Sequence, residues 1–255
     1  MQISISLTRI LFMKNWLFIF ICFAFFGLSA QSEKPPNFVV VFCDDLGYGD
    51  IGSFGHPLIH TPNIDRMAVE GQKWTQFYVA DPVCTPSRAG LLTGRYPIRN
   101  GMTSSERHVF FPDSPNGLPL EELTIAEVLK EAGYRTGAFG KWGLGYPGSE
   151  GDPNFQGFDQ FYGYNCQRVA HNYYPTHLWN NQNKDKLCGN NGTSTLTYAP
   201  ELIHQKALSF LEENKESPFF MFYPSVIPHA ELVAPVEYMT RYRGLFLPEK
   251  KFIRK

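Results

Sequence analysis

Apolar residues are spaced along the chain in a way that predicts alternating strands and helices. The continuous run from Asn37 to Cys43 is rich in β-branched residues, which predicts a strand buried on both faces. Further apolar runs predict strands at 74–79, 134–139 and 219–223. Apolar residues at helical spacing predict helices that begin near residues 62, 125 and 200. Such an alternation is typical of the α/β class.

Two of the predicted helices have recognisable end signals. The Thr-Pro pair at 61–62 suits the cap and first turn of a helix that Gly71 ends. A capping-box pattern at 124–127 opens another helix, which is predicted to stop at Gly133. The segment 179–197 is rich in Asn, Gly and Thr, and this composition predicts a long surface loop.

The N-terminal segment has the pattern of an export signal. Arg9 and Lys14 precede an apolar run over residues 16–28, and a polar segment follows. We expect residues 1–30 to be a signal peptide and the mature chain to begin near Gln31. The run is shorter than the roughly 20 residues that span a bilayer. The sequence therefore predicts a periplasmic or secreted protein without a stable membrane anchor.

Composition narrows the class of protein. The chain has 255 residues, of which 43% are hydrophobic, so it can form a sizeable core. Its 23 Lys and Arg nearly balance its 24 Asp and Glu, and it has no basic run, so we expect no nucleic-acid partner. Because export permits disulfides, Cys166 and Cys188 are predicted to pair, and Cys43 is predicted to be buried.

The segment Cys84-Thr85-Pro86-Ser87-Arg88, followed by Ala-Gly-Leu-Leu-Thr-Gly-Arg, is the strongest chemical motif. It resembles the signature of the type I sulfatases, in which the cysteine is converted to Cα-formylglycine and its hydrated aldehyde is the nucleophile. The resemblance implies that Cys84 is catalytic and that a formylglycine-modifying enzyme acts on this chain. Thr85 and Pro86 also suit the start of a helix, whose positive end favours an anionic substrate.

A second segment, Asp44-Asp45-Leu46-Gly47-Tyr48, resembles the first metal-binding segment of the same family. The resemblance implies that Asp44, Asp45 and the modified Cys84 ligate a divalent ion, usually calcium. Carboxylate oxygens at a strand end suit Ca²⁺, with Mg²⁺ as the alternative. The predicted strand would place both aspartates at its carboxyl end, where ligands bind in open α/β sheets.

The resemblance assigns roles to three further residues. Arg88 is expected beside the nucleophile and the metal. Lys141 is expected to contact a sulfate oxygen, and His229 is expected to contact the oxygen of the leaving group. A metal, two cations and a helix terminus around the ester would supply the electrostatic stabilisation that sulfuryl transfer needs.

At one position the chain departs from the commonest family pattern. Many sulfatases carry a histidine where this chain has Gly143, and that histidine is assigned as the base that collapses the sulfated hemiacetal. Glycine cannot accept a proton. His171 is the candidate replacement, because a histidine that titrates near neutrality suits this task. The alternative is that His171 is a structural or substrate-pocket residue.

The resemblance extends from Asn37 to about Phe252 but covers only the first part of the family's length. Residues 31–255 are therefore expected to be the N-terminal portion of a sulfatase catalytic domain, truncated before the second metal-binding pair and the small C-terminal domain. The implied fold is an alkaline-phosphatase-like central mixed β-sheet flanked by helices. Ca²⁺ prefers six to eight oxygen ligands, so we expect weakened metal binding, poor solubility and little turnover.

Three functions remain open at this stage. The first is a sulfuric ester hydrolase that releases sulfate from sulfated carbohydrates or aryl sulfates. The second is a phosphoester or phosphonate hydrolase of the same superfamily. The third is a non-catalytic remnant, for which Gly143 and the expected truncation are the evidence.

Overall fold

The structure is a computed structural model that describes residues 34–103, 109–112, 114–229 and 232–245. The predicted signal segment lies outside the described residues. Among the described helices, none combines the length and the apolarity that crossing a bilayer requires. Residues 37–255 group into one compact unit, and the fold described below belongs to that unit.

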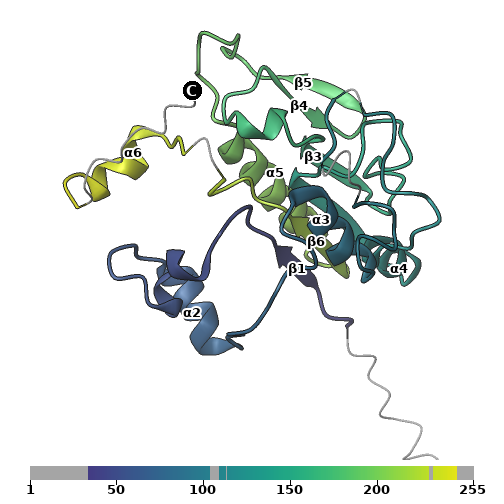
Figure 1. The fold of residues 1–255 in the computed structure, drawn as a ribbon, viewed down its shortest axis with the longest axis horizontal. Coiled ribbons are helices and arrows are strands. Elements are labelled where there is room, and N and C mark those ends of the chain that lie inside the picture. The colour runs from purple at the N-terminus through teal and green to yellow at the C-terminus, as the bar shows by residue number, and fades with distance from the viewer. Residues whose placement is uncertain (1–33, 104–108, 113, 230–231, 246–255) are drawn as a thin grey trace, which may run out of the picture. The chain divides into compact units, whose positions relative to one another are not determined.

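The centre of the unit is a six-stranded mixed sheet with the order β1-β6-β2-β3-β4-β5 (Figure 1). Strands β1, β6, β2 and β3 run parallel to one another, and β4 and β5 continue the sheet in antiparallel pairs. The strands are β1 (Phe38–Val41), β2 (Arg135–Lys141), β3 (Gln160–Tyr164), β4 (His177–Asn180), β5 (Asn183–Lys186) and β6 (Phe219–Tyr223).

Helices cover both faces of this sheet. The α-helices are α2 (Pro62–Glu70), α3 (Cys84–Thr93), α4 (Ile125–Glu131), α5 (Ala199–Asn214) and α6 (Val236–Met239). Short 3₁₀ turns are η1 (Tyr48–Asp50), η2 (Gly52–Phe54), η3 (Val169–His171) and η4 (Thr240–Tyr242). Alternate residues of β6 enter different cores: Phe219 and Met221 pack with α5, whereas Phe220 and Phe222 pack with residues of α3 and α4. The α/β class and the mixed sheet predicted from the sequence are confirmed.

Several predicted elements lie where the pattern placed them. Helix α2 begins at Pro62 and is capped by Gly71, α5 covers the predicted segment, and β6 matches its predicted range. The capping box at α4 is present, because Thr124 accepts from the backbone of Glu127 and the Glu127 side chain accepts in return. Thr61 precedes α2, but its hydroxyl does not cap that helix and instead donates to Asp65 at 2.9 Å.

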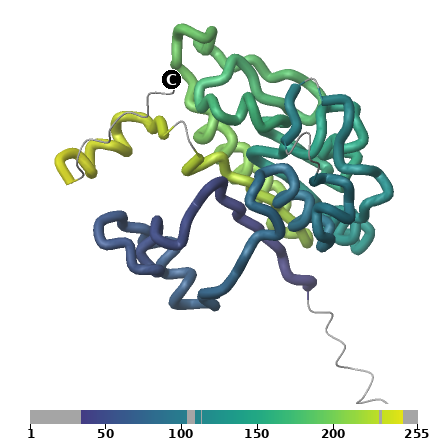
Figure 2. The backbone as a smooth tube through the Cα atoms, in the orientation of Figure 1, coloured from purple at the N-terminus to yellow at the C-terminus, as the bar shows by residue number. Residues whose placement is uncertain are grey.

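Two strand predictions need correction. Strand β1 is shorter than predicted, and it is an edge strand because β6 is its one partner among the described strands. It is not buried on both faces, because Val39 and Val41, which share one face, are 49% and 57% exposed. The segment 74–79 forms no strand, since its backbone lies in turns and extended chain without a neighbouring strand. Figure 2 shows the chain leaving the sheet after β1 and returning to it at α3.

The predicted surface loop at 179–197 is also wrong in its first part. Strands β4 and β5 form an antiparallel hairpin there, with Asn180 paired to Asn183. The two-residue turn places Asn181 at φ 52°, in the left-handed region that asparagine tolerates. An asparagine-rich composition therefore marked a tight turn between strands as well as a loop.

The cysteine predictions also need correction. Cys166 and Cys188 are both free thiols, and one is buried whereas the other is exposed. Cys43 is free and only half-buried, because it follows an edge strand instead of a central one. The predicted disulfide is absent from the structure.

Candidate functional site

Three parallel strands bring the candidate residues to one edge of the sheet. Asp44 follows β1, Lys141 is the last residue of β2, and His229 lies on the loop after β6. Because β6 lies between β1 and β2, the carboxyl ends of all three strands are neighbours. Cys84 is the first residue of α3, which packs on the same region of the sheet. This edge is where ligands bind in open α/β sheets.

Backbone hydrogen bonds hold the two flanking segments to the loop after β6. The amide of Asp44 donates to the carbonyl of Ser225 at 3.1 Å, and the amide of Lys141 donates to that of Pro224 at 2.7 Å. Gly140 permits this approach, because a Cβ added there would lie 2.1 Å from the Pro224 carbonyl oxygen. The positions of Asp44 and Lys141 are thus fixed by main chain as well as by side chains.

Asp44 is the anion at the centre of a buried charge cluster. Its Oδ1 accepts from Nη2 of Arg88 at 3.0 Å, and its Oδ2 accepts from Nζ of Lys141 at 2.5 Å. All three side chains are buried. Burial raises the pKa of Asp44, but the two cations outweigh burial and hold that pKa below its ordinary value. Arg88 also donates to the carbonyl of Lys141 at 2.6 Å, which ties α3 to β2.

Cys84 lies beside this cluster. Its Sγ is 3.5 Å from Nζ of Lys141. Burial raises the pKa of the Cys84 thiol, although the charge of Lys141 opposes that effect. The unmodified thiol is therefore mostly protonated at neutral pH and is a poor nucleophile.

Two histidines complete the cluster. Nε2 of His229 lies 3.4 Å from Oδ2 of Asp45, and the ring of His171 stacks on that of His229 with 4.4 Å between centroids. Asp45 has φ 59°, so the chain turns sharply after Asp44 and the two adjacent carboxylates reach different partners. Nδ1 of His229 is buried and has no hydrogen-bond partner among the described residues. The structure thus brings together all seven residues that the sequence analysis singled out, which are Asp44, Asp45, Cys84, Arg88, Lys141, His171 and His229.

The donor atoms near Cys84 were tested as a metal site. One ligand atom each from Asp44, Cys84 and His229 lies within 4.8 Å of the others. Carboxylate oxygens suit a hard cation such as Ca²⁺, whereas a thiol does not. Asp44 is the one carboxylate of this set, so the set fits Ca²⁺ or Mg²⁺ through Asp44, and it fits better when an oxygen group replaces the Cys84 thiol. His229 was not predicted as a neighbour of the metal, since its motif indicated only contact with the leaving group.

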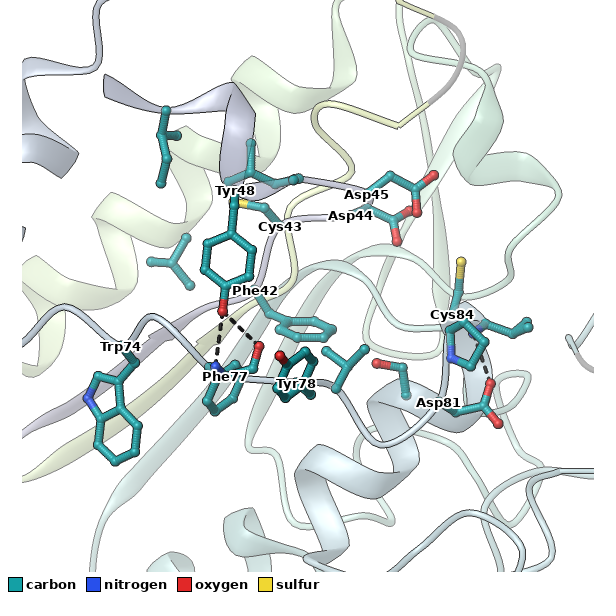
Figure 3. A pocket seen from close by; sticks show the side chains of 18 of the residues that line it. Phe42, Cys43, Asp44, Asp45, Tyr48, Trp74, Phe77, Tyr78, Asp81 and Cys84 are labelled. Atoms are coloured by element: carbon teal, nitrogen blue, oxygen red, sulfur yellow. Dashed lines mark hydrogen bonds between the residues drawn. The ribbon is translucent and has the colours of Figure 1, made fainter. Parts of the chain in front are cut away.

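A pocket of about 690 Å³ opens beside this cluster. Figure 3 shows Asp44, Asp45 and Cys84 together at one end of it. Aromatic residues line the rest of the pocket: Phe42, Tyr48, Trp74, Phe77 and Tyr78. The hydroxyl of Tyr48 bridges the backbone of Phe77, donating to its carbonyl at 2.9 Å and accepting from its amide at 3.0 Å. The pocket thus combines an apolar, aromatic wall with an end that carries the carboxylates of Asp44, Asp45 and Asp81.

The sequence analysis missed one buried side chain near this site. Gln167 donates through Nε2 to the hydroxyl of Thr85, the residue after Cys84, at 3.2 Å. The signal that could have found it is Gly143, because a missing side chain in a motif that resembles the family's leaves space that another residue must fill. Gln167 fills that space.

Comparison with known proteins identifies the family. The family model described as Sulfatase matches residues 36–251. Arylsulfatase A of Homo sapiens is 55% identical over 132 residues, which cover 51% of this chain and 25% of that protein. N-acetylgalactosamine-6-sulfatase of Rattus norvegicus is 37% identical over 237 residues, which cover 86% of this chain and 44% of that protein. The chain thus spans less than half the length of these relatives.

A solved structure supports the same conclusion. A protein crystallised with its substrate D-glucosamine-2-N,6-O-disulfate superposes with a TM-score of 0.67 and 30% sequence identity, covering 86% of this chain and 40% of its own. Such matches confirm the alkaline-phosphatase-like fold predicted for the described part of the chain. The family model covers most of the sequence and the predicted residues meet in one site, so the chain belongs to the sulfatase family.

Proposed function

We propose that this chain is a sulfuric ester hydrolase that acts on sulfated carbohydrates or aryl sulfates. The observation that carries the proposal is the position of Lys141 and Arg88. Both side chains bind Asp44, and Lys141 also lies beside Cys84, the first residue of the sulfatase motif. Nζ of Lys141 lies 3.5 Å from Sγ of Cys84. The similar structure with a bound glucosamine disulfate supports a sulfated sugar as the substrate class.

We propose that Cys84 is converted to formylglycine and that Ca²⁺, or Mg²⁺, binds beside it. Asp44 and Asp45 would hold the ion with the oxygen of the modified residue, and His229 borders this group. When bound, the ion and the modified residue would supply Lewis acidity and the attacking hydroxyl. The protein's own contribution is the fixed arrangement of charges that receives the ester.

Arg88 and Lys141 receive the negative charge of the sulfate group. Both side chains are buried, so their interactions with an anion are screened less than they would be in water. Arg88 is held by Asp44 and by the Lys141 carbonyl, so it needs no rearrangement when an anion binds. The start of α3 adds backbone N–H groups at the same point.

His229 and His171 are the proton carriers in this proposal. Nε2 of His229 lies 3.4 Å from Oδ2 of Asp45, which orients the ring. His229 is placed to donate a proton to the leaving alcohol oxygen. His171 stacks on His229 and is placed to take part in the later release of sulfate.

The decisive experiment examines Cys84 and its chemistry together. The chain would be expressed with a formylglycine-modifying enzyme, and mass spectrometry of the Cys84 peptide would report an aldehyde or its hydrate. Hydrolysis of an aryl sulfate should exceed that of the matching aryl phosphate, and Cys84→Ala should abolish it. Preference for the phosphate would indicate a phosphoester hydrolase instead. Conversion without hydrolysis of either ester would indicate a non-catalytic remnant.

Single-turnover measurements separate the two histidines. His229→Ala should slow release of the alcohol, whereas His171→Ala should slow release of sulfate after the alcohol has left. Loss of a general acid or base typically costs about 10²–10⁴-fold in rate. Unchanged sulfate release in His171→Ala would remove His171 from the mechanism.

We further propose export to the periplasm or the medium, based on the sequence of residues 1–30. N-terminal sequencing of the protein recovered outside the cytoplasm should begin near Gln31. Recovery of the uncleaved chain from the cytoplasm alone would contradict this proposal.

A further inference from the structure

The side chain of Gln167 occupies the space above Gly143. Gly143 has φ 74°, a conformation that favours glycine, and a Cβ built on it would lie 1.8 Å from Nε2 of Gln167. Gln167 is 2% exposed and cannot move aside into solvent. Any side chain at position 143 would therefore displace the amide of Gln167.

That amide joins two segments of the candidate site. Nε2 of Gln167 donates to Oγ1 of Thr85 at 3.2 Å and approaches the carbonyl oxygen of Gly143 at 3.5 Å. The Thr85 hydroxyl in turn donates to that same carbonyl at 2.8 Å. Thr85 follows Cys84 directly, and Gly143 lies two residues after Lys141. The three groups thus tie the start of α3 to the end of β2.

A second connection holds Gln167 itself in place. Its backbone amide donates to the carbonyl of Phe110 at 3.4 Å, and the amide of Phe110 donates to Oγ1 of Thr85 at 3.4 Å. Oε1 of Gln167 is buried and has no partner among the described residues. A buried amide oxygen without a partner is costly. The buried Oε1 of Gln167 therefore destabilises the protein. The hydrogen bonds that Nε2 of Gln167 donates hold the side chain in this position.

We propose that Gln167 is a positioning residue that fixes Cys84 relative to Lys141. It does so through Thr85 and the Gly143 carbonyl, and its amide takes the space that a side chain at position 143 would need. The pair Gly143 and Gln167 is thus one structural unit. The catalytic consequence rests on the proposed sulfatase function, whereas the geometric consequence does not.

The test replaces the amide without removing its volume. Gln167→Met keeps the length of the side chain and removes the donor. Gln167→Glu keeps the heavy-atom shape and turns the donor into an acceptor, and it serves as the second variant if the first fails to fold. Gln156→Met is the matched control, because Gln156 is equally buried, also has an Oε1 without a partner among the described residues, and donates to the Leu118 and Glu150 carbonyls at 2.9 Å.

Two readouts are taken from each full-length variant. The first is the rate at which iodoacetamide alkylates the unconverted Cys84 thiol at fixed pH, which depends on the nearby Lys141 charge. The second is the single-turnover rate of aryl sulfate hydrolysis by the converted protein. A displacement of about 1 Å at a reacting group can cost up to about 100-fold in rate. We expect both Gln167 variants to slow aryl sulfate hydrolysis by about tenfold or more on this basis and to change the alkylation rate of Cys84, and we expect Gln156→Met to leave both rates unchanged.

The outcomes separate this inference from the proposed function. If the parent protein alkylates normally but hydrolyses no sulfate ester, the proposed function fails and the alkylation rates still test the position of Cys84. Equal alkylation rates in Gln167→Met, Gln167→Glu and the parent protein would overturn the inference. An equal loss in Gln156→Met would overturn it as well, because the effect would then be a general loss of stability.

Discussion

Replacing Asp44 with asparagine is the sharpest test of the buried charge cluster. Asp44→Asn keeps the shape of the side chain and removes the anion that faces both Arg88 and Lys141. Those two side chains have no exposed surface, so their charges cannot be solvated in place of the lost partner. The variant therefore leaves two buried cations without compensation, and the folded state should lose stability.

The magnitude follows from the distances. For the contact of 3.0 Å between Arg88 and Asp44, Coulomb's law with an effective dielectric constant near 20 gives about 5.5 kcal/mol before desolvation is subtracted. Removing one partner of a buried ion pair typically costs about 3–5 kcal/mol. We therefore expect a loss of about 3–5 kcal/mol. That is a large fraction of the roughly 5–15 kcal/mol by which domains are stable.

The assay is urea unfolding at neutral pH, followed by circular dichroism, with Asp45→Asn as the control. Asp45 is the next residue in the chain, but its side chain is 59% exposed, and His229 is its one ion-pair partner among the described residues. An exposed ion pair contributes about 0–1 kcal/mol, so Asp45→Asn should be nearly neutral. Equal losses in the two variants would show that burial of charge does not govern stability at this site.

Three further predictions concern the rest of the unit. The pKa of Asp44 in the folded protein is lowered below its ordinary value of 3.8. The contribution of Asp44 to stability should therefore be complete above pH 3.8 and should fall as the pH drops through the pKa of the folded state. Urea unfolding in the acid range would show this loss. Cys188 should be alkylated before Cys166 in a time course followed by mass spectrometry, because Cys166 is buried and burial raises the pKa of its thiol. Simultaneous labelling of the two cysteines would contradict this prediction. Trp142→Phe should destabilise the protein by about 1–3 kcal/mol in thermal or urea unfolding, because the indole N–H donates to a buried carbonyl at 2.7 Å. Trp74→Phe, at a side chain that is 65% exposed, should not.

Local signals were sufficient for the elements whose structure is decided locally. The Thr124 capping box and the aromatic run of β6 act over a few residues, and both lie where the sequence placed them. Strand β1 was predicted as a buried central strand because its residues are apolar, but apolar composition does not specify how many neighbours a strand has. The segment 74–79 failed for the same reason, since a strand exists only where a partner supplies its hydrogen bonds.

The candidate site was predictable to the extent that each residue stood in a family motif. Asp44, Cys84, Lys141 and His229 each follow or begin an element, so topology brings them together. Gln167 could not be found this way, because its role arises from contact with Thr85 across 82 residues of sequence and from the empty space at Gly143. The sequence likewise could not show that Asp44 binds both Arg88 and Lys141, because that arrangement appears only in the interatomic distances.

The position of β6 in the sheet has a consequence for how the protein is made. Strand β6 follows the other described strands in the sequence but lies between β1 and β2, and its following loop holds Asp44 and Lys141 in place. The sheet therefore cannot close around Cys84 until translation has passed residue 223. At the usual synthesis rate of about 5–20 residues per second, this leaves roughly 7–28 s after Cys84 is made. Under the modification proposed above, an enzyme that acts on the Cys84 side chain before folding thus has an interval that depends on strand order, and moving β6 earlier in the chain by circular permutation should lower the extent of modification.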